Sequence, residues 1–221
     1  MVTNERKVQW KYYFTAGLIT LVIFLVGIYF SFFLDKMKVS SLEGSVREMR
    51  ITQEDAELEM TAINLLGGKK CDVLLHEIEG IVPKAAELGE KLEFYEARER
   101  FQDPSYPSLK KDYTLTLVRY WLFVSKAKDD CKYGYEPILY FYSNDKCDDC
   151  IRQGTVLSYL KEQHPQKIMV FAIDNDIKLG SITLIKGAYN VTKTPSIILN
   201  ETLFEGLQDL GKTRELLNLT S

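Results

Sequence analysis

The sequence Pro137-Ile-Leu-Tyr-Phe-Tyr-Ser-Asn-Asp-Lys-Cys-Asp-Asp-Cys150 joins an apolar, aromatic run to two cysteines that are separated by two residues. Residues 138–142 lack helical spacing, and we expect them to form a central strand. An amphipathic pattern over residues 148–163 then predicts a helix that starts at the cysteines. A cysteine pair at a helix N-terminus favours redox chemistry, because this position stabilises a thiolate.

The remaining C-terminal residues continue with alternating strand and helix patterns. Apolar runs predict three more strands, at 167–173, 196–199 and 202–205. The last two strands are joined by a turn at Asn200-Glu201, which predicts a hairpin. Two more helices are expected at 178–189 and 212–219. The predicted order is β-α-β-α-β-β-α, an α/β domain that we place at residues 132–221.

Thr194-Pro195 stands directly before the strand at 196–199. This position of a Thr-Pro, the order of elements and the C-x-x-C pair together resemble the thioredoxin family over residues 137–221. The resemblance implies that Pro195 follows a cis peptide bond and faces the cysteines. It also implies that Thr194 offers backbone groups to an extended substrate, which would give the uncommon cis bond a reason.

The same resemblance implies an enzyme, a thiol–disulfide oxidoreductase that acts on exported or membrane proteins. Cys147 would be the exposed nucleophile and Cys150 the resolving thiol, with exchange through a mixed disulfide. The expected partners are protein substrates that carry thiols or disulfides. A separate redox partner is also needed, because the sequence offers no second membrane segment to relay electrons.

Four positions depart from the family pattern. Lys146 stands where the family usually has an aromatic residue, and its ammonium group favours a thiolate. Asp148-Asp149 separates the cysteines; these carboxylates disfavour a thiolate but suit the first turn of a helix. Phe141 occupies the place of the buried acid that thioredoxins carry on the first strand.

Two other interpretations of the C-x-x-C pair remain open. The pair could be half of a zinc site, but zinc needs four ligands, and the chain offers no second C-x-x-C and only His76 and His164. We therefore expect neither a metal nor another cofactor. The pair could also be an inert disulfide in a non-catalytic binding module or scaffold that is anchored at the membrane, since a fold alone does not establish an activity.

Residues 14–34 form an uncharged run of 21 residues, long enough to cross the roughly 30 Å hydrocarbon core of a bilayer. Trp10, Tyr12 and Tyr13 precede it, as in an interfacial aromatic belt. A cleaved signal peptide is the alternative, but no cleavage site of small residues follows the run. We expect a single transmembrane helix that contacts lipid, preceded by a short cytoplasmic tail at residues 1–13.

The orientation in the membrane is only weakly encoded, because lysines and arginines occur on both sides of the apolar run. The cysteine pattern favours C-terminal domains that lie outside the cytoplasm, where disulfides persist. The net charge of −3, without a long basic block, gives no indication of nucleic-acid binding.

Residues 35–131 are predicted to form an all-helical spacer. The pattern indicates three helices, at 40–66, from Asp72 onward, and from Leu109 to near Lys128. We expect Pro83 to interrupt the second helix or to restart it, and residues 103–107 to form the loop before the third. Such a spacer could also mediate contacts between copies in an oligomer.

Cys71 and Cys131 bracket the second and third helices of this spacer. If these helices run antiparallel, their outer ends meet, and a structural disulfide between the two cysteines is expected. The alternative is a pair of free buried thiols in a cytoplasmic protein.

Overall fold

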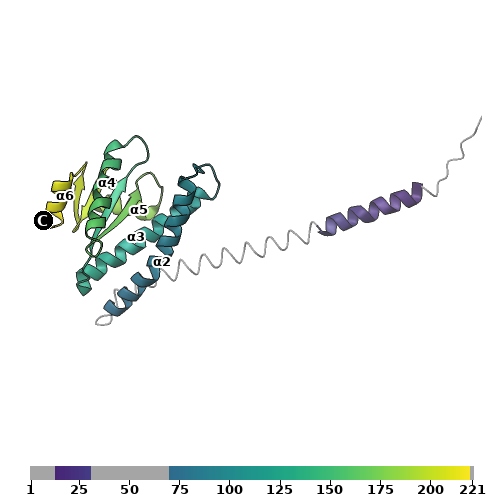
Figure 1. Ribbon diagram of the computed structural model, residues 1–221. Coiled ribbons are helices and arrows are strands. Elements are labelled where there is room, and N and C mark those ends of the chain that lie inside the picture. Colours follow the sequence, from purple (N-terminus) through teal and green to yellow (C-terminus); the bar gives the residue numbers. More distant parts are fainter. Residues whose placement is uncertain (1–12, 31–69, 220–221) are drawn as a thin grey trace, which may run out of the picture. The chain divides into compact units, whose positions relative to one another are not determined.

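The computed structural model describes residues 13–30 and 70–219 (Figure 1). The chain divides into two compact units, residues 1–65 and 66–221. In the first unit the described residues form one helix, Tyr13–Phe30, with a mean hydropathy of 2.2. This helix is long and apolar enough to cross a membrane, and a signal sequence would have the same properties. Residues 31–34 and the helix predicted at 40–66 lie outside the described residues.

The second unit is built on a mixed four-stranded sheet in the order β2-β1-β3-β4. Its strands are β1 (Glu136–Tyr142), β2 (Ile168–Asp174), β3 (Ser196–Leu199) and β4 (Thr202–Glu205). β1 pairs in parallel with β2 and antiparallel with β3, and β4 pairs antiparallel with β3. The central position of β1 explains its uninterrupted apolar run, because both of its faces are covered.

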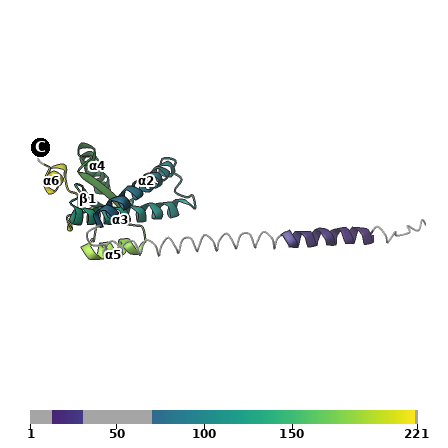
Figure 2. The ribbon, with the colours of Figure 1, turned by 90° about the horizontal axis from the view of Figure 1, so that it is seen from below.

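Helices cover both faces of the sheet, and Figure 2 shows α4 and α5 on opposite sides. On one face, α4 (Asp148–Gln163) and α6 (Leu210–Leu216) share an apolar cluster with Ile138 and Tyr140 of β1. On the other face lie α3 (Tyr106–Cys131) and α5 (Gly180–Tyr189). There Tyr120 of α3 packs edge-on against Phe171 of β2, with ring centroids 5.0 Å apart.

The helical hairpin and the sheet belong to the same compact unit. The long helix α2 (Lys70–Glu96) packs along α3, and α3 also contacts β1 and β2. Tyr120 and Trp121 of α3 lie against Phe171 and the α5 residue Tyr189. The sequence predicted a domain boundary between residues 131 and 132. In the structure no boundary lies there, and residues 66–221 form one unit. The reason is that α3 packs apolar side chains against both α2 and the sheet.

Two predicted helix boundaries in the hairpin are also corrected. Pro83 neither interrupts nor restarts α2, which runs without a break from Lys70 to Glu96. Pro83 and its neighbours Val82 and Lys84 are exposed, so water can hydrate the carbonyl group that loses its helical partner. α3 begins at Tyr106 inside the predicted loop, because Pro107 fits a first helical turn, where no N–H group is needed.

The C-terminal elements agree closely with the predicted α/β order. The boundaries of α4, β3 and β4 are those predicted, and β1, β2 and α5 differ by at most two residues. In the β3–β4 turn Asn200 and Glu201 both have positive φ, 49° and 59°, as a two-residue type I′ turn requires. Helix α6 begins earlier than predicted, because the Asp209 side chain accepts a hydrogen bond from Lys212 N at 2.8 Å.

A disulfide joins Cys71 in the first turn of α2 to Cys131 at the end of α3, with 5.6 Å between the Cα atoms. It closes the open end of the hairpin. Glu96 and Tyr106 close the other end, where the Tyr106 hydroxyl donates to the Glu96 carboxylate at 2.9 Å.

We predict that the double substitution Cys71→Ala/Cys131→Ala lowers the free energy of unfolding by roughly 4 kcal/mol, because a closed loop of this length restricts the unfolded chain. Urea unfolding of the full-length protein in detergent, followed by the fluorescence of the buried Trp121, measures the change. An unchanged unfolding midpoint would show that the disulfide does not stabilise the hairpin.

Candidate active site

Cys147 and Cys150 lie at the N-terminus of α4 and form a disulfide, with an S–S distance of 2.00 Å. Cys147 is the N-cap residue, and its sulfur accepts a hydrogen bond from Cys150 N at 3.2 Å. Cys147 is partly buried, whereas Cys150 is only 4 % exposed. The pair therefore has an outer sulfur, which a partner molecule can approach, and an inner one.

The inner cysteine is fixed by the strand that precedes the pair. The Tyr140 hydroxyl of β1 donates to Cys150 O at 2.6 Å, and Ser143 N donates to the Cys150 sulfur at 3.5 Å. These contacts join the start of α4 to the end of β1. A thiolate at position 150 would find a donor already in place.

Thr194 and Pro195 lie beside the outer cysteine. The Thr194–Pro195 peptide bond is cis, and Thr194 Oγ1 is 4.0 Å from the sulfur of Cys147. The sheet explains this proximity, because antiparallel pairing sets Ser196 of β3 opposite Phe141 of β1. The residues just before β3 therefore lie next to the residues just after β1.

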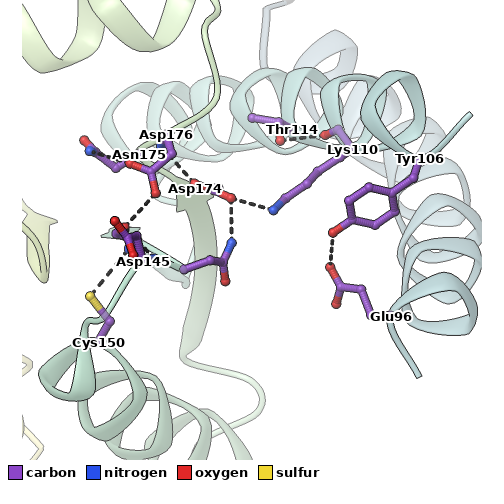
Figure 3. Close-up of polar contacts among 11 residues, drawn as sticks. Glu96, Tyr106, Lys110, Thr114, Asp145, Cys150, Asp174, Asn175 and Asp176 are labelled. Atoms are coloured by element: carbon purple, nitrogen blue, oxygen red, sulfur yellow. Dashed lines mark hydrogen bonds and ion pairs between the residues drawn. The ribbon is translucent and has the colours of Figure 1, made fainter. Parts of the chain in front are cut away.

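A buried ion pair lies behind the cysteines (Figure 3). Lys110 Nζ of α3 is 2.5 Å from Asp174 Oδ2 at the end of β2, and the two side chains are 14 % and 5 % exposed. Asn144 Nδ2 donates to the same carboxylate oxygen at 2.7 Å. The ion pair thus connects the helical hairpin, the sheet and the loop that leads to Cys147.

A second set of hydrogen bonds ties this loop to the end of β2. Ser143 Oγ donates to Asp176 Oδ2 at 2.6 Å and accepts from Asp145 N at 3.0 Å. Asp176 N in turn donates to Asp174 Oδ1 at 2.8 Å. Residues 143–145 are therefore held on one side by the cysteine and on the other by two aspartates (Figure 3).

The sequence did not indicate Lys110, Asp174, Ser143 or Asn144 as site residues. Asp174-Asn-Asp176 was recognised only as the end of a strand. Lys110 lies more than sixty positions from Asp174, so no local pattern connects them. The one available signal was a run of polar residues after each of two neighbouring parallel strands, at Ser143-Asn-Asp and Asp174-Asn-Asp.

The charges around the cysteines are mixed. Asp148 and Asp149 are exposed in the first turn of α4, where carboxylates interact favourably with the helix N-terminus. Arg152 pairs with Asp149 at 3.2 Å. Lys146 is exposed with a positive φ of 49°. Phe141 is fully buried, so the end of β1 presents no acid under the pair.

The other residues considered from the sequence lie elsewhere. Within residues 13–30 and 70–219, no group of three or more His, Cys, Asp or Glu could hold a metal ion. His164 follows the last residue of α4, at the opposite end from Cys147, and His76 lies in α2. Along α3, Cys131 is about 30 Å from Lys110 at 1.5 Å per residue, so the Cys71–Cys131 disulfide is remote from the pair.

The arrangement can support thiol–disulfide chemistry. In the reduced state, Cys150 N and the N-terminus of α4 would stabilise a thiolate on Cys147, and thiolates are the reactive form of cysteine. The sequence matches no protein-family model and no curated protein.

We predict that Lys110→Met lowers the free energy of unfolding by about 3 kcal/mol, because it leaves the buried Asp174 carboxylate without its cation. Lys84 of α2 offers a matched control, since it pairs with Asp112 of α3 at 3.9 Å with both side chains more than half exposed. Lys84→Met should change stability by less than about 0.5 kcal/mol. Equal losses in urea unfolding would contradict a special contribution of the buried pair.

Tyr140 gives a predicted pH dependence. Burial raises the pKa of its phenol to about 12 from an ordinary value of 10.0. The native state therefore keeps a proton that the unfolded chain loses, so this contribution to stability is complete below pH 10 and disappears as the pH rises to about 12.

In Tyr140→Phe the free energy of unfolding should fall less between pH 10 and about pH 12 than in the unsubstituted protein. Urea unfolding at a series of pH values measures this difference. Tyr159→Phe, at an exposed position of α4, is the control. Identical pH profiles for Tyr140→Phe and the unsubstituted protein would refute the assignment.

Proposed function

We propose that this protein is a membrane-anchored thiol–disulfide oxidoreductase that exchanges disulfides in exported or membrane proteins through Cys147 and Cys150. The observation that carries the proposal is the disulfide at the N-terminus of α4, whose outer sulfur lies beside Thr194 of a cis Thr-Pro peptide. A disulfide formed by neighbouring cysteines at a helix start is accessible to exchange.

We further propose that residues 132–221 are a thioredoxin-like domain. Four features support this assignment: the order β-α-β-α-β-β-α, the strand order β2-β1-β3-β4, the C-x-x-C pair after β1, and the cis proline before β3. In this protein the domain carries an additional helical hairpin, α2–α3, which covers part of one sheet face.

The proposed reaction transfers two electrons between dithiol and disulfide. The Cys147 thiolate attacks one sulfur of a substrate disulfide, forms a mixed disulfide and releases the other substrate sulfur as a thiolate, which takes up a proton. The Cys150 thiolate then attacks the Cys147 sulfur. This step releases the second substrate thiol and leaves the pair oxidised. A redox partner that carries a dithiol resets the pair, and the reverse sequence oxidises a substrate.

Each nearby group has a role in this scheme. Cys150 N stabilises the attacking thiolate, and Ser143 N stabilises the resolving one. Thr194 offers backbone groups to an extended substrate segment, as a strand edge does. The carboxylates of Asp148 and Asp149 destabilise a thiolate in the pair, whereas the ammonium group of Lys146 stabilises it. The balance of these opposing charges helps to set the reduction potential of the pair.

The proposed location follows from the apolar helix and the second disulfide. Tyr13–Phe30 would anchor the protein in the membrane, with a short tail in the cytoplasm. The unit that contains Cys71–Cys131 would then lie outside the cytoplasm, where disulfides persist.

A non-catalytic binding module is the second candidate, and two observations favour it. Both residues between the cysteines are acidic, and Phe141 leaves no buried acid to accept a proton from Cys150. In that case the pair would act as a fixed cross-link, and the Thr194–Pro195 edge would hold a partner peptide.

We predict that Cys150→Ser traps mixed disulfides with disulfide-bearing partners through Cys147, because the resolving sulfur is absent, whereas Cys147→Ser traps none. Full-length protein in detergent is equilibrated with glutathione, alkylated and analysed by peptide mass. In the unsubstituted protein the 147–150 pair should titrate at a defined potential while Cys71–Cys131 stays oxidised. If excess reduced glutathione leaves the 147–150 disulfide intact and Cys150→Ser traps no partner, the exchange activity is refuted. The non-catalytic binding module would then be the better assignment.

A further inference from the structure

A groove of about 390 Å³ runs beside the redox pair, between α2 and α4. Tyr140 and Tyr142 of β1 and Ala172 of β2 line it from the sheet, and Cys150 and Ile151 line it from α4. β2 is an edge strand, and Ala172 on it is exposed. A molecule in this groove therefore lies directly against the start of α4.

Small residues keep the groove open. Gly154 of α4 and Gly89 of α2 line its two sides. A Cβ atom on Gly154 would lie 3.9 Å from the Tyr140 ring, and one on Gly89 would lie 3.4 Å from the ring of Tyr113. Larger side chains at these positions would cover the tyrosine rings. Tyr140 itself is only 4 % exposed, so the aromatic surface available to a ligand comes from the half-buried rings of Tyr113 and Tyr142.

The charge of the groove has a single sign. Its two charged lining residues are Glu93 and Glu96, one helical turn apart on α2. Glu96 accepts one hydrogen bond from Tyr106, and Glu93 is exposed. The next arginines in the chain, Arg98 and Arg100, lie over the ring of Phe94, which is not part of the lining.

Carboxylates next to tyrosine rings favour the binding of a cation. Carboxylates attract an ammonium or guanidinium group, and the faces of tyrosine rings bind the same groups through their quadrupole. Burial raises the pKa of Tyr142, and the charges of Asp174 and then of Glu96 raise it further, so its phenol stays neutral at physiological pH. The volume admits one or two side chains of a polypeptide.

We propose that the groove binds a basic side chain, lysine or arginine, of the substrate polypeptide near its reactive cysteine. This inference rests on the proposed function and specifies its substrate class. The bound cation lies between the Glu93 and Glu96 carboxylates and the tyrosine rings, while exposed Ile151 contacts the adjoining apolar part of the segment. The hairpin α2–α3 thus contributes substrate selectivity to the redox pair.

The test compares two short peptides that differ only in arginine or glutamine next to a cysteine held as a mixed disulfide with glutathione. Full-length protein in detergent, with the 147–150 pair first reduced to the dithiol, should react about tenfold faster with the arginine peptide, which corresponds to about 1.4 kcal/mol. The variant Glu93→Gln/Glu96→Gln should lose most of this preference, and added salt should reduce it in the unsubstituted protein.

Two further variants separate the groove from general effects. Ala172→Trp fills the groove from an exposed strand position and should slow both peptides, with the larger effect on the arginine peptide. Glu79→Gln/Glu90→Gln removes two exposed charges of α2 that do not line the groove and should leave the preference intact. The control Glu79→Gln/Glu90→Gln should also keep the glutathione equilibrium of the 147–150 pair.

A preference that is absent, or equal in the unsubstituted protein and in Glu93→Gln/Glu96→Gln, overturns the inference. If neither peptide reacts with the unsubstituted protein, the proposed exchange activity fails instead. Binding of the same two peptides with serine in place of cysteine, measured by fluorescence anisotropy, then decides. Tighter binding of the arginine peptide that depends on Glu93 and Glu96 supports the groove, and equal binding refutes it.

Discussion

The pairing of β1 with two neighbours of opposite direction is the constraint on which the rest of this structure depends. Parallel pairing sets Tyr142 beside Asp174, and antiparallel pairing sets Phe141 beside Ser196. The end of β1, the end of β2 and the start of β3 therefore meet at one edge of the sheet. Cys147, Asp174 and Pro195 come together there, although they are distant in the sequence.

The helical hairpin α2–α3 supports the site at this end of the sheet. Lys110 reaches the buried carboxylate of Asp174, and that carboxylate in turn accepts a hydrogen bond from Asn144 in the loop before the cysteines. A buried carboxylate without a cation would be costly, so the loop geometry depends on a residue of α3. The hairpin is closed at its far end by Cys71–Cys131, which limits its separation into two independent helices.

Much of the fold could be predicted because its signals are local. The strands, the hairpin turn at Asn200-Glu201 and the helix at 148–163 each follow from spacing or turn chemistry within a few residues. Two of the failures had local causes as well. Pro83 was expected to break a helix that tolerates it on an exposed side, and the cap at Asp209 was overlooked. The domain boundary at 131/132 could not be judged, because only packing reveals that α3 contacts the sheet.

The sequence by itself determined the alternation of strands and helices, the apolar N-terminal helix and the cysteine pair at a helix start. These features depend on periodicity and on residue chemistry at short range. Only the tertiary structure decided that Lys110 pairs with Asp174 and that Glu93 and Glu96 face a tyrosine-lined groove next to Cys150. These contacts join residues far apart in the chain, and their positions are set by strand register and helix packing, which no local pattern encodes.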